Sequence, residues 1–293
     1  MKHLRTLEDV TAAELREILL LAARIKKNPD RYRRTLAGKS VALLFEKPST
    51  RTRMSFEIGI AELGGTPVVL DWQSTQLGRA ALQDEVRCMA RYVDAIGARV
   101  RSHKTIEEMA KYAGVPIINL LSDKRHPCQA IGDMMTLQEC FPDLAKVNLV
   151  FVGDGNNVCN SLIAAAIKLG LRMTVSCPKG YNPDPELIRT AKKGSIRIER
   201  DPTRACKNAD VIYTDTWVSM GQERQRKARL AVFRPYKITK RLLGRALFMH
   251  CLPAFRGEEV ADEVIDSSQS IVFEQAENRL HAQKALLIKL LGR

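Results

Sequence analysis

The chain has 293 residues, of which 45% are hydrophobic, and a formal net charge of +14 at pH 7. This length allows one large or two ordinary domains, and no apolar run approaches the roughly 20 residues of a membrane span. Seven scattered cysteines without a CxxC pair argue against a disulfide framework or zinc ribbon and favour reduced thiols. Because the N-terminus also has no apolar h-region, we expect a cytoplasmic protein that neither enters nor spans a membrane.

The first half of the chain alternates helix and strand patterns. Thr11 and Glu14 form a capping box before a helical repeat that extends to Ile25. A short buried strand is expected at 39–45, and the helix that follows residues 49–53 is apolar on two faces, which predicts that both are buried. Further strands are expected at 66–71, 94–100 and 115–121, and further helices near 80–91, 105–113 and 128–140.

A second alternating series begins after residues 141–146, where a proline and a change of charge indicate a domain junction. Strands are expected within 147–155, 172–178, 195–199, 210–215, 246–253 and 270–276, and a long helix at about 275–291. This alternation predicts an α/β fold of two domains, each a parallel β-sheet flanked by helices, with the C-terminal helix packing back on the N-terminal domain. We place the domains at 1–141 with the C-terminal helix 275–293, and at 145–274.

The positive charge alone could indicate nucleic acid, an anionic substrate or a basic surface. Lysines and arginines are dispersed, as at 24–34 and 222–229, and aromatic residues make up only 5%. Without a basic tail or a recognised reader motif, a solvated basic surface is the better interpretation. We therefore expect no nucleic-acid partner.

Ligands of open parallel sheets bind beyond the carboxyl ends of the strands, and the notable polar residues of this chain follow strands. The run STRTR, residues 49–53, lies between a strand and a helix. A helix N-terminus binds anions, and hydroxyls and guanidiniums add donors. A capped helix with exposed arginines is the alternative, but two arginines in the first turn oppose the helix dipole and favour a bound anion. With Arg51 in this run, Arg99 and His126 at two further strand ends are suited to one small oxyanion-rich ligand.

Different polar groups follow strands in the second half. The segment VGDGNN at 152–157 lacks the GxGxxG spacing of a dinucleotide site, so Asn156 and Asn157 indicate amide contacts to a polar ligand. Asp215, in TDTWVSMG, can hold a ligand ammonium under the loop that follows it. His250 and Cys251 are poor evidence for a metal because no CxxC or HxxxH partner accompanies them. A polarised thiol or backbone carbonyl facing the ligand is the better interpretation.

In this order and spacing, FEKPSTRTR, Arg99, HPCQ, DTWVSMG and HCLP resemble the aspartate/ornithine carbamoyltransferase family. SMG and HCLP together resemble its ornithine-specific members, and the similarity runs from about residue 4 to the C-terminal helix. The resemblance implies transfer of the carbamoyl group of carbamoyl phosphate to the δ-amine of L-ornithine, giving L-citrulline and phosphate. It implies no metal, no cofactor, and a homotrimer with shared active sites.

Position by position, the resemblance also implies two sets of binding residues. Those for carbamoyl phosphate are Ser49, Thr50, Arg51, Thr52, Gln76, Arg99, His126, Gln129, Cys251, Leu252 and Arg279. Those for ornithine are Asn157, Asp215, Ser219 and Met220. The catalytic residues would be Arg51, Arg99, His126 and Cys251, with the amine attacking directly and donors stabilising the oxyanion. Gln76 would serve the site of a neighbouring subunit.

Some positions depart from the family pattern, and alternative functions stay open. Ala80 and Ala81 stand where relatives often carry Gly-Glu, and Glu85 where they often carry threonine, all close to Gln76. A carbamoyltransferase for another amine, such as putrescine, would not need DTWVSMG. A basic regulatory or nucleic-acid-binding protein on the same scaffold would not need the combined set of polar residues. The sequence does not distinguish arginine synthesis from citrulline breakdown.

Overall fold

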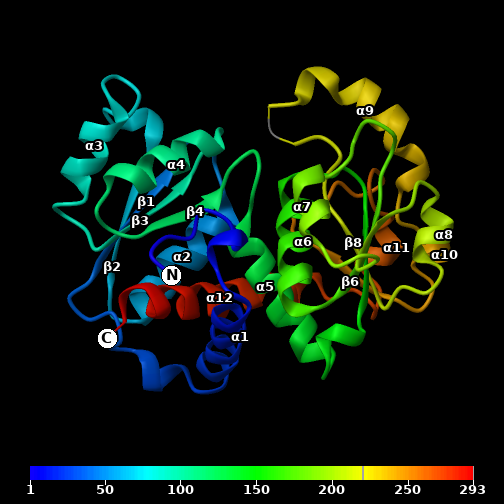
Figure 1. The fold of residues 1–293 in the computed structure, drawn as a ribbon, viewed down its shortest axis with the longest axis horizontal. Coiled ribbons are helices and arrows are strands. Elements are labelled where there is room, and N and C mark those ends of the chain that lie inside the picture. Colours follow the sequence, from blue (N-terminus) through cyan, green and yellow to red (C-terminus); the bar gives the residue numbers. More distant parts are fainter. Residues whose placement is uncertain (220, 293) are drawn as a thin grey trace. The chain divides into compact units, whose positions relative to one another are not determined.

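The computed structural model describes residues 1–219 and 221–292 and folds into two compact units, each built around one parallel β-sheet (Figure 1). Unit 1 comprises Met1–Met135 together with the chain from Glu277 onward, and unit 2 comprises Thr136–Ala276. Two parallel sheets flanked by helices confirm the predicted fold class. Among the described residues, no helix combines the length and apolar character that a membrane crossing requires.

The sheet of unit 1 has four parallel strands in the order β2-β1-β3-β4. The strands are β1 (Ser40–Phe45), β2 (Thr66–Asp71), β3 (Ala95–Arg99) and β4 (Ile117–Leu121). The helices of the first 140 residues are α1 (Ala12–Lys27), α2 (Thr50–Glu62), α3 (Leu82–Met89), α4 (His103–Tyr112) and α5 (Pro127–Cys140). Phe45 pairs with Arg99, so β1 and β3 end side by side. The chain order reverses at β1, which makes this edge the expected ligand position.

The sheet of unit 2 has five parallel strands in the order β7-β6-β5-β8-β9. The strands are β5 (Asn148–Val152), β6 (Arg172–Ser176), β7 (Ile196–Ile198), β8 (Val211–Thr214) and β9 (Leu247–His250). The remaining helices are α6 (Asn157–Leu169), α7 (Pro185–Thr190), α8 (Pro202–Cys206), α9 (Arg226–Phe233), α10 (Lys240–Leu243), α11 (Asp262–Ile265) and α12 (Val272–Leu291). Short 3-10 helices are η1 (Leu7–Asp9), η2 (Pro29–Tyr32), η3 (Trp72–Ser74), η4 (Leu144–Lys146), η5 (Glu223–Gln225) and η6 (Arg234–Tyr236). Val152 pairs with Thr214, so the reversal of order falls between the ends of β5 and β8.

Both sheets are covered on their faces, as parallel sheets require. In unit 1, Ala42 and Leu44 of β1 pack in one cluster with Val86 of α3 and Ile106 and Met109 of α4. In unit 2, strand residues pack in a cluster that also contains aromatic residues of the loops and of α9. Since the faces are filled by apolar side chains, polar chemistry is confined to the edges where the strands end.

The C-terminal helix packs on unit 1, which confirms the sequence prediction. A Cβ added at Gly59 of α2 would lie 3.3 Å from Leu280 Cδ1, so the two helices approach closely. The buried Lys284 forms an ion pair with Glu62 at the end of α2. The predicted capping box at the start of α1 is also present, with Thr11 and Glu14 bonding each other's backbone N–H groups.

Two local predictions are wrong. The expected strand at 270–276 is the start of α12, because Ser270 makes only an isolated bridge to Phe248 and the helix begins at Val272. The helix α2 is buried on one face only. Phe56 and Ile60 are fully buried. On the opposite face of the helix, Met54 is 59% exposed and Ile58 is 48% exposed in this chain.

We predict that Gly155, which follows β5, tolerates no side chain. An added Cβ would lie 2.2 Å from the backbone N of Pro183, so Gly155→Ala must displace a neighbouring loop, at about 1–3 kcal/mol or more. Gly180 has φ +91 with nothing within 4 Å, so Gly180→Ala adds only backbone strain, about 1 kcal/mol.

Unfolding followed by tryptophan fluorescence tests this. The chain has two tryptophans, so in a Trp72→Phe background the signal comes from Trp217 in unit 2. Gly155→Ala should lower the midpoint clearly more than Gly180→Ala. Equal midpoints would show that the loop containing Pro183 moves aside at no cost.

Candidate functional site

The helix α2 begins where β1 ends, as the run STRTR predicts. Ser49 is its N-cap, and its Oγ accepts a hydrogen bond from the backbone N–H of Thr52 at 3.3 Å. Thr50 is the first helical residue and Arg51 follows it. The free N–H groups and positive dipole end of this first turn are therefore available to an anion at the β1–β3 edge.

Arg279 of α12 reaches the same turn. Its Nη2 donates to Thr52 Oγ1 at 2.9 Å, and both side chains are buried. The approach depends on Gly132 of α5, because a Cβ there would lie 3.0 Å from Arg279 Cγ and 3.3 Å from its Cα. The structure thus joins two predicted phosphate ligands that are 227 residues apart in sequence.

His126, just before α5, is buried among positive charges. Its pKa lies well below the ordinary value because of burial, with further lowering by Arg279 and Arg99. These couplings bring three predicted ligands into one electrostatic neighbourhood. At neutral pH the imidazole is uncharged, so it can donate a hydrogen bond but does not add positive charge.

Lys47 belongs to this positive group, although sequence reasoning did not select it. Its pKa is lowered by burial, then by Arg99 and Arg101. The signal was present in the sequence, since Lys47 stands two residues before Ser49 in the same loop. Cations held near one another and partly out of water are stabilised when an anion binds among them.

Gln129 and Gln76 differ in their surroundings. Gln129 is 1% exposed, and its Nε2 donates to Asp133 Oδ1 one helical turn later at 2.8 Å. Gln76 is exposed between η3 and α3, and its Oε1 accepts from Arg79 at 3.3 Å. Within the described part of this chain, no hydrogen bond joins Gln76 to the other predicted phosphate ligands.

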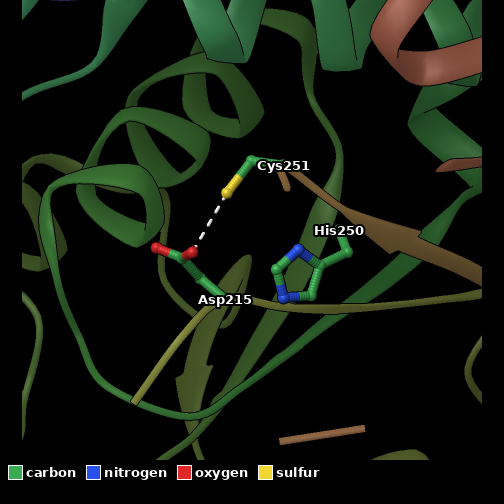
Figure 2. Close-up of side chains that lie close together, drawn as sticks. All are labelled: Asp215, His250 and Cys251. Atoms are coloured by element: carbon green, nitrogen blue, oxygen red, sulfur yellow. Dashed lines mark hydrogen bonds between the residues drawn. The ribbon is translucent and has the colours of Figure 1, made fainter. Parts of the chain in front are cut away.

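In unit 2, Asp215 is the centre of a hydrogen-bonded group at the end of β8 (Figure 2). Its Oδ2 accepts from Asn156 Nδ2 at 2.6 Å, and its Oδ1 accepts from the Thr216 backbone at 2.8 Å and from Cys251 Sγ at 3.0 Å. Asp215 is only 8% exposed. Asp215 and the HCLP segment are therefore in direct contact, which sequence reasoning did not predict.

The two asparagines after β5 have separate positions. Asn156 caps α6, with Oδ1 accepting from the N–H groups of Val158 and Cys159, while Asn157 is the first helical residue and half-buried. Ser219 is half-buried and its backbone N–H donates to Gln222 Oε1 at 3.1 Å. Met220, another predicted ornithine ligand, lies outside the described residues.

The side chains of Asp215, His250 and Cys251 offer three ligand atoms within 4.8 Å of one another. Both ring nitrogens of His250 are engaged, however. Nδ1 accepts from the Leu252 backbone at 2.9 Å, and Nε2 lies 3.2 Å from the buried Glu259. Metal binding by His250 would have to break one of these bonds. The hydrogen bonds of His250 are better explained by a structural role, in which the imidazole holds the Leu252 backbone, than by metal binding.

Arg229 of α9 is a further residue that sequence reasoning missed. Its Nη2 forms an ion pair with Asp154 after β5, its Nε donates to the Trp217 carbonyl after β8, and its guanidinium lies 5.0 Å from the Tyr181 ring centroid. It is 4% exposed. Burial raises the pKa of Asp154, Arg229 opposes this, and Asp215 adds to it. Arg229 therefore balances the second carboxylate beside Asp215. The sequence contained one indication of this burial, because Arg229 lies four residues before the apolar Phe233 and so on the same face of a helix. The basic residues around Arg229 made it resemble a surface arginine.

Comparisons with known proteins agree with this geometry. Residues 2–139 match the profile described as aspartate/ornithine carbamoyltransferase, carbamoyl-P binding domain, and residues 145–290 match the Asp/Orn binding domain of the same family. A protein of Archaeoglobus fulgidus named ornithine carbamoyltransferase is 51% identical over 304 residues, covering 100% of this chain and 98% of the relative.

Solved structures show the same fold. The ornithine carbamoyltransferase of Pyrococcus furiosus has a TM-score of 0.95 and 48% identity, covering 99% of this chain and 97% of that one. That of Thermus thermophilus has a TM-score of 0.91 and 41% identity, with 99% coverage of both. With both domain profiles matched and identity near one half along the whole length, the chain belongs to the aspartate/ornithine carbamoyltransferase family.

Proposed function

We propose that the chain transfers the carbamoyl group of carbamoyl phosphate to the δ-amine of L-ornithine, giving L-citrulline and phosphate. The observation that carries this is the contrast between the two strand edges. Unit 1 gathers buried cations around a helix N-terminus, whereas unit 2 presents a buried carboxylate beside a thiol. An oxyanion suits the first and an ammonium the second. The relatives named ornithine carbamoyltransferase support the same pair of substrates.

In this proposal residues 1–141, with the C-terminal helix 275–293, bind carbamoyl phosphate. Ser49, Thr50 and Thr52 supply hydroxyl and backbone donors to the phosphate. The guanidiniums of Arg51, Arg99 and Arg279 match its charge, and arginine suits it because the planar fork can bond two oxygens at once.

Catalysis in this proposal is direct attack of the neutral δ-amine on the carbamoyl carbon. Negative charge develops on the carbonyl oxygen, where Arg99 and neutral His126 donate, and loss of one such donor costs about 2.7–4 kcal/mol. The phosphate leaves as an anion already paired with arginine. The phosphate donors belong to unit 1 and the groups assigned to the amino acid belong to unit 2.

Residues 145–274 bind ornithine in this proposal. Asp215 pairs with the α-ammonium, and Asn157, Ser219 and Met220 complete the contacts to the amino-acid end. Cys251 and the Leu252 carbonyl then face the reacting amine. Putrescine keeps the amine that corresponds to the α-ammonium but lacks the α-carboxylate, so the contacts of Asn157, Ser219 and Met220 to the amino-acid end would favour ornithine.

We also propose a homotrimer in the cytoplasm. Gln76 is exposed in this chain, which suits a residue that serves a neighbouring subunit, and Met54 and Ile58 form an exposed apolar pair on α2. All seven cysteines are free thiols, which favours a reducing compartment.

Replacement of Asp215 by asparagine tests the ornithine assignment. Asp215→Asn keeps one oxygen, which can still accept from the Thr216 N–H, but removes the charge and the second oxygen that accepts from Asn156. We expect kcat/KM for ornithine to fall at least about a hundredfold, because a buried charge that loses its partner costs about 3–5 kcal/mol. Carbamoyl phosphate affinity, measured by calorimetry, should stay within about threefold. A fall of less than about threefold in kcat/KM for ornithine would contradict the assignment.

Two arginines of α9 form a matched pair. Arg229→Met removes a buried guanidinium and leaves Asp154 unbalanced beside Asp215, so ornithine kcat/KM should fall at least about tenfold. Arg226 pairs with Glu258 at 45% side-chain exposure, and Arg226→Met should cost no more than about threefold. Adding Asp154→Asn to Arg229→Met should restore part of the loss. Similar effects of the two arginine variants would show that α9 acts only through its overall charge.

The charge state of His126 gives a pH test. A base with a lowered pKa is neutral above that pKa, so His126 should show no protonation step near pH 6.5 in a proton NMR titration, with His126→Asn assigning its signal. Arg279→Gln should raise the pKa of His126, yet leave it below the ordinary value because burial persists. Arg53→Gln, at an exposed arginine of α2, should leave it unchanged. A wild-type titration at the ordinary value would refute the neutral donor.

A further inference from the structure

Asp133 is a fully buried carboxylate that no step of the proposed reaction uses. It lies on α5 with 0% exposure, one turn after Gln129, and its Oδ1 accepts from Gln129 Nε2 at 2.8 Å. Gln129 is itself 1% exposed. A buried carboxylate requires an explanation, because taking a charge out of water is costly unless specific bonds repay it.

The chemistry of this pair decides which way the Gln129 amide points. An amide has a donor end and an acceptor end of nearly equal size, and its orientation follows from its partners. An ionised carboxylate can only accept hydrogen bonds. Gln129 must therefore turn its NH2 toward Asp133, which leaves Oε1 directed away from it. A neutral amide or hydroxyl at position 133 would not impose this choice.

The surroundings of Gln129 indicate which group its Oε1 would contact. Gly132 allows Arg279 to approach α5, and Arg279 bonds Thr52 at the phosphate position. His126, at the start of the helix, is coupled to Arg279 and Arg99. All of these groups donate hydrogen bonds. A ligand that meets them with its oxygens and also carries an NH2 group requires one acceptor, and the family resemblance implies Gln129 for that role.

We propose that Asp133 is a positioning residue that determines selectivity for carbamoyl phosphate over acyl phosphates of equal charge. It holds Gln129 Oε1 toward the carbamoyl NH2. Acetyl phosphate has a methyl group at that position and cannot donate. This inference rests on the proposed function, since it requires carbamoyl phosphate as the ligand. The competing explanation is that Asp133 only balances the buried cations, in which case it would affect every phosphate ligand alike.

Three variants separate these explanations. Asp133→Leu removes the acceptor, so the Gln129 amide should turn its NH2 away from leucine and toward the ligand, where it opposes the carbamoyl NH2. Asp133→Asn removes the charge but can still accept through Oδ1, although it also permits the reversed amide. Gln129→Met removes the amide itself. Dissociation constants of carbamoyl phosphate, acetyl phosphate and inorganic phosphate are measured by calorimetry without amine, with thermal melts as a folding check.

We expect the wild type to bind carbamoyl phosphate at least about tenfold more tightly than acetyl phosphate, since a site built for a donor discriminates against an analogue that lacks it. Asp133→Leu and Gln129→Met should each reduce this ratio at least about fivefold, and their combination should reduce it no further than Gln129→Met alone. Asp133→Asn should lose only about twofold, because two amide orientations become nearly equivalent. Affinity for inorganic phosphate should be nearly unchanged in Asp133→Asn.

The outcomes that overturn the inference are distinct. If Asp133→Leu changes the affinity of all three ligands by the same factor, Asp133 acts through charge. If Asp133→Leu does not fold, the Asn variant decides, because a charge role predicts altered inorganic phosphate affinity and an unchanged ratio. A wild type that binds both ligands equally would reject Gln129 as the selective acceptor. A wild type that binds neither would instead reject the proposed function.

Discussion

Every strand of a parallel sheet ends at the same edge, and the rest of this structure depends on that constraint. Apolar side chains cover the central strands of each sheet, so the polar groups of these strands collect beyond their ends. In each sheet the chain order reverses between two central strands, which separates the adjoining loops and leaves space for a ligand. Phe45 and Arg99 mark this position in unit 1, and Val152 and Thr214 mark it in unit 2.

The strand ends of the two units carry charged groups of different sign. Unit 1 holds several cations near one another. Burial and the neighbouring positive charges both lower the pKa values of Lys47 and His126. At the strand ends of unit 2, Asp154 is paired with the guanidinium of Arg229, and Asp215 accepts hydrogen bonds from Asn156 and Cys251. Cations are prominent at the edge of unit 1, although Glu46 and Asp123 also act on Lys47, and carboxylates are prominent at the edge of unit 2. The ligands assigned to them carry the complementary sign where they would meet these residues.

Local patterns in the sequence predict most of the strands, the capping box at Thr11 and the start of a helix after Ser49, because short-range hydrogen bonds and burial determine these features. Arg279 could be assigned only through the family resemblance, since its bond to Thr52 joins distant segments. Arg229 and Asp133 were missed because neither a buried arginine nor a buried aspartate differs from a surface one in a single sequence. Burial of these groups follows from tertiary packing.

Apolar periodicity also has limits of its own. The pattern of α2 indicates which residues are apolar, but not whether a second face is covered by this chain, and Met54 and Ile58 are exposed. At 270–276 a short apolar segment was compatible with a strand. The helix α12 prevails there because Val272 and Gln275 are buried at helical spacing.

The cation cluster of unit 1 also has a consequence for turnover. Charge attraction does not distinguish the phosphate group of a substrate from the free phosphate that the reaction releases. In the proposed function, groups such as Arg279 and Lys47 that would recruit the substrate would retain the product as well. If the proposed site is correct, the same charges would raise substrate affinity and slow product release, so the departure of phosphate would compete with chemistry for control of the rate.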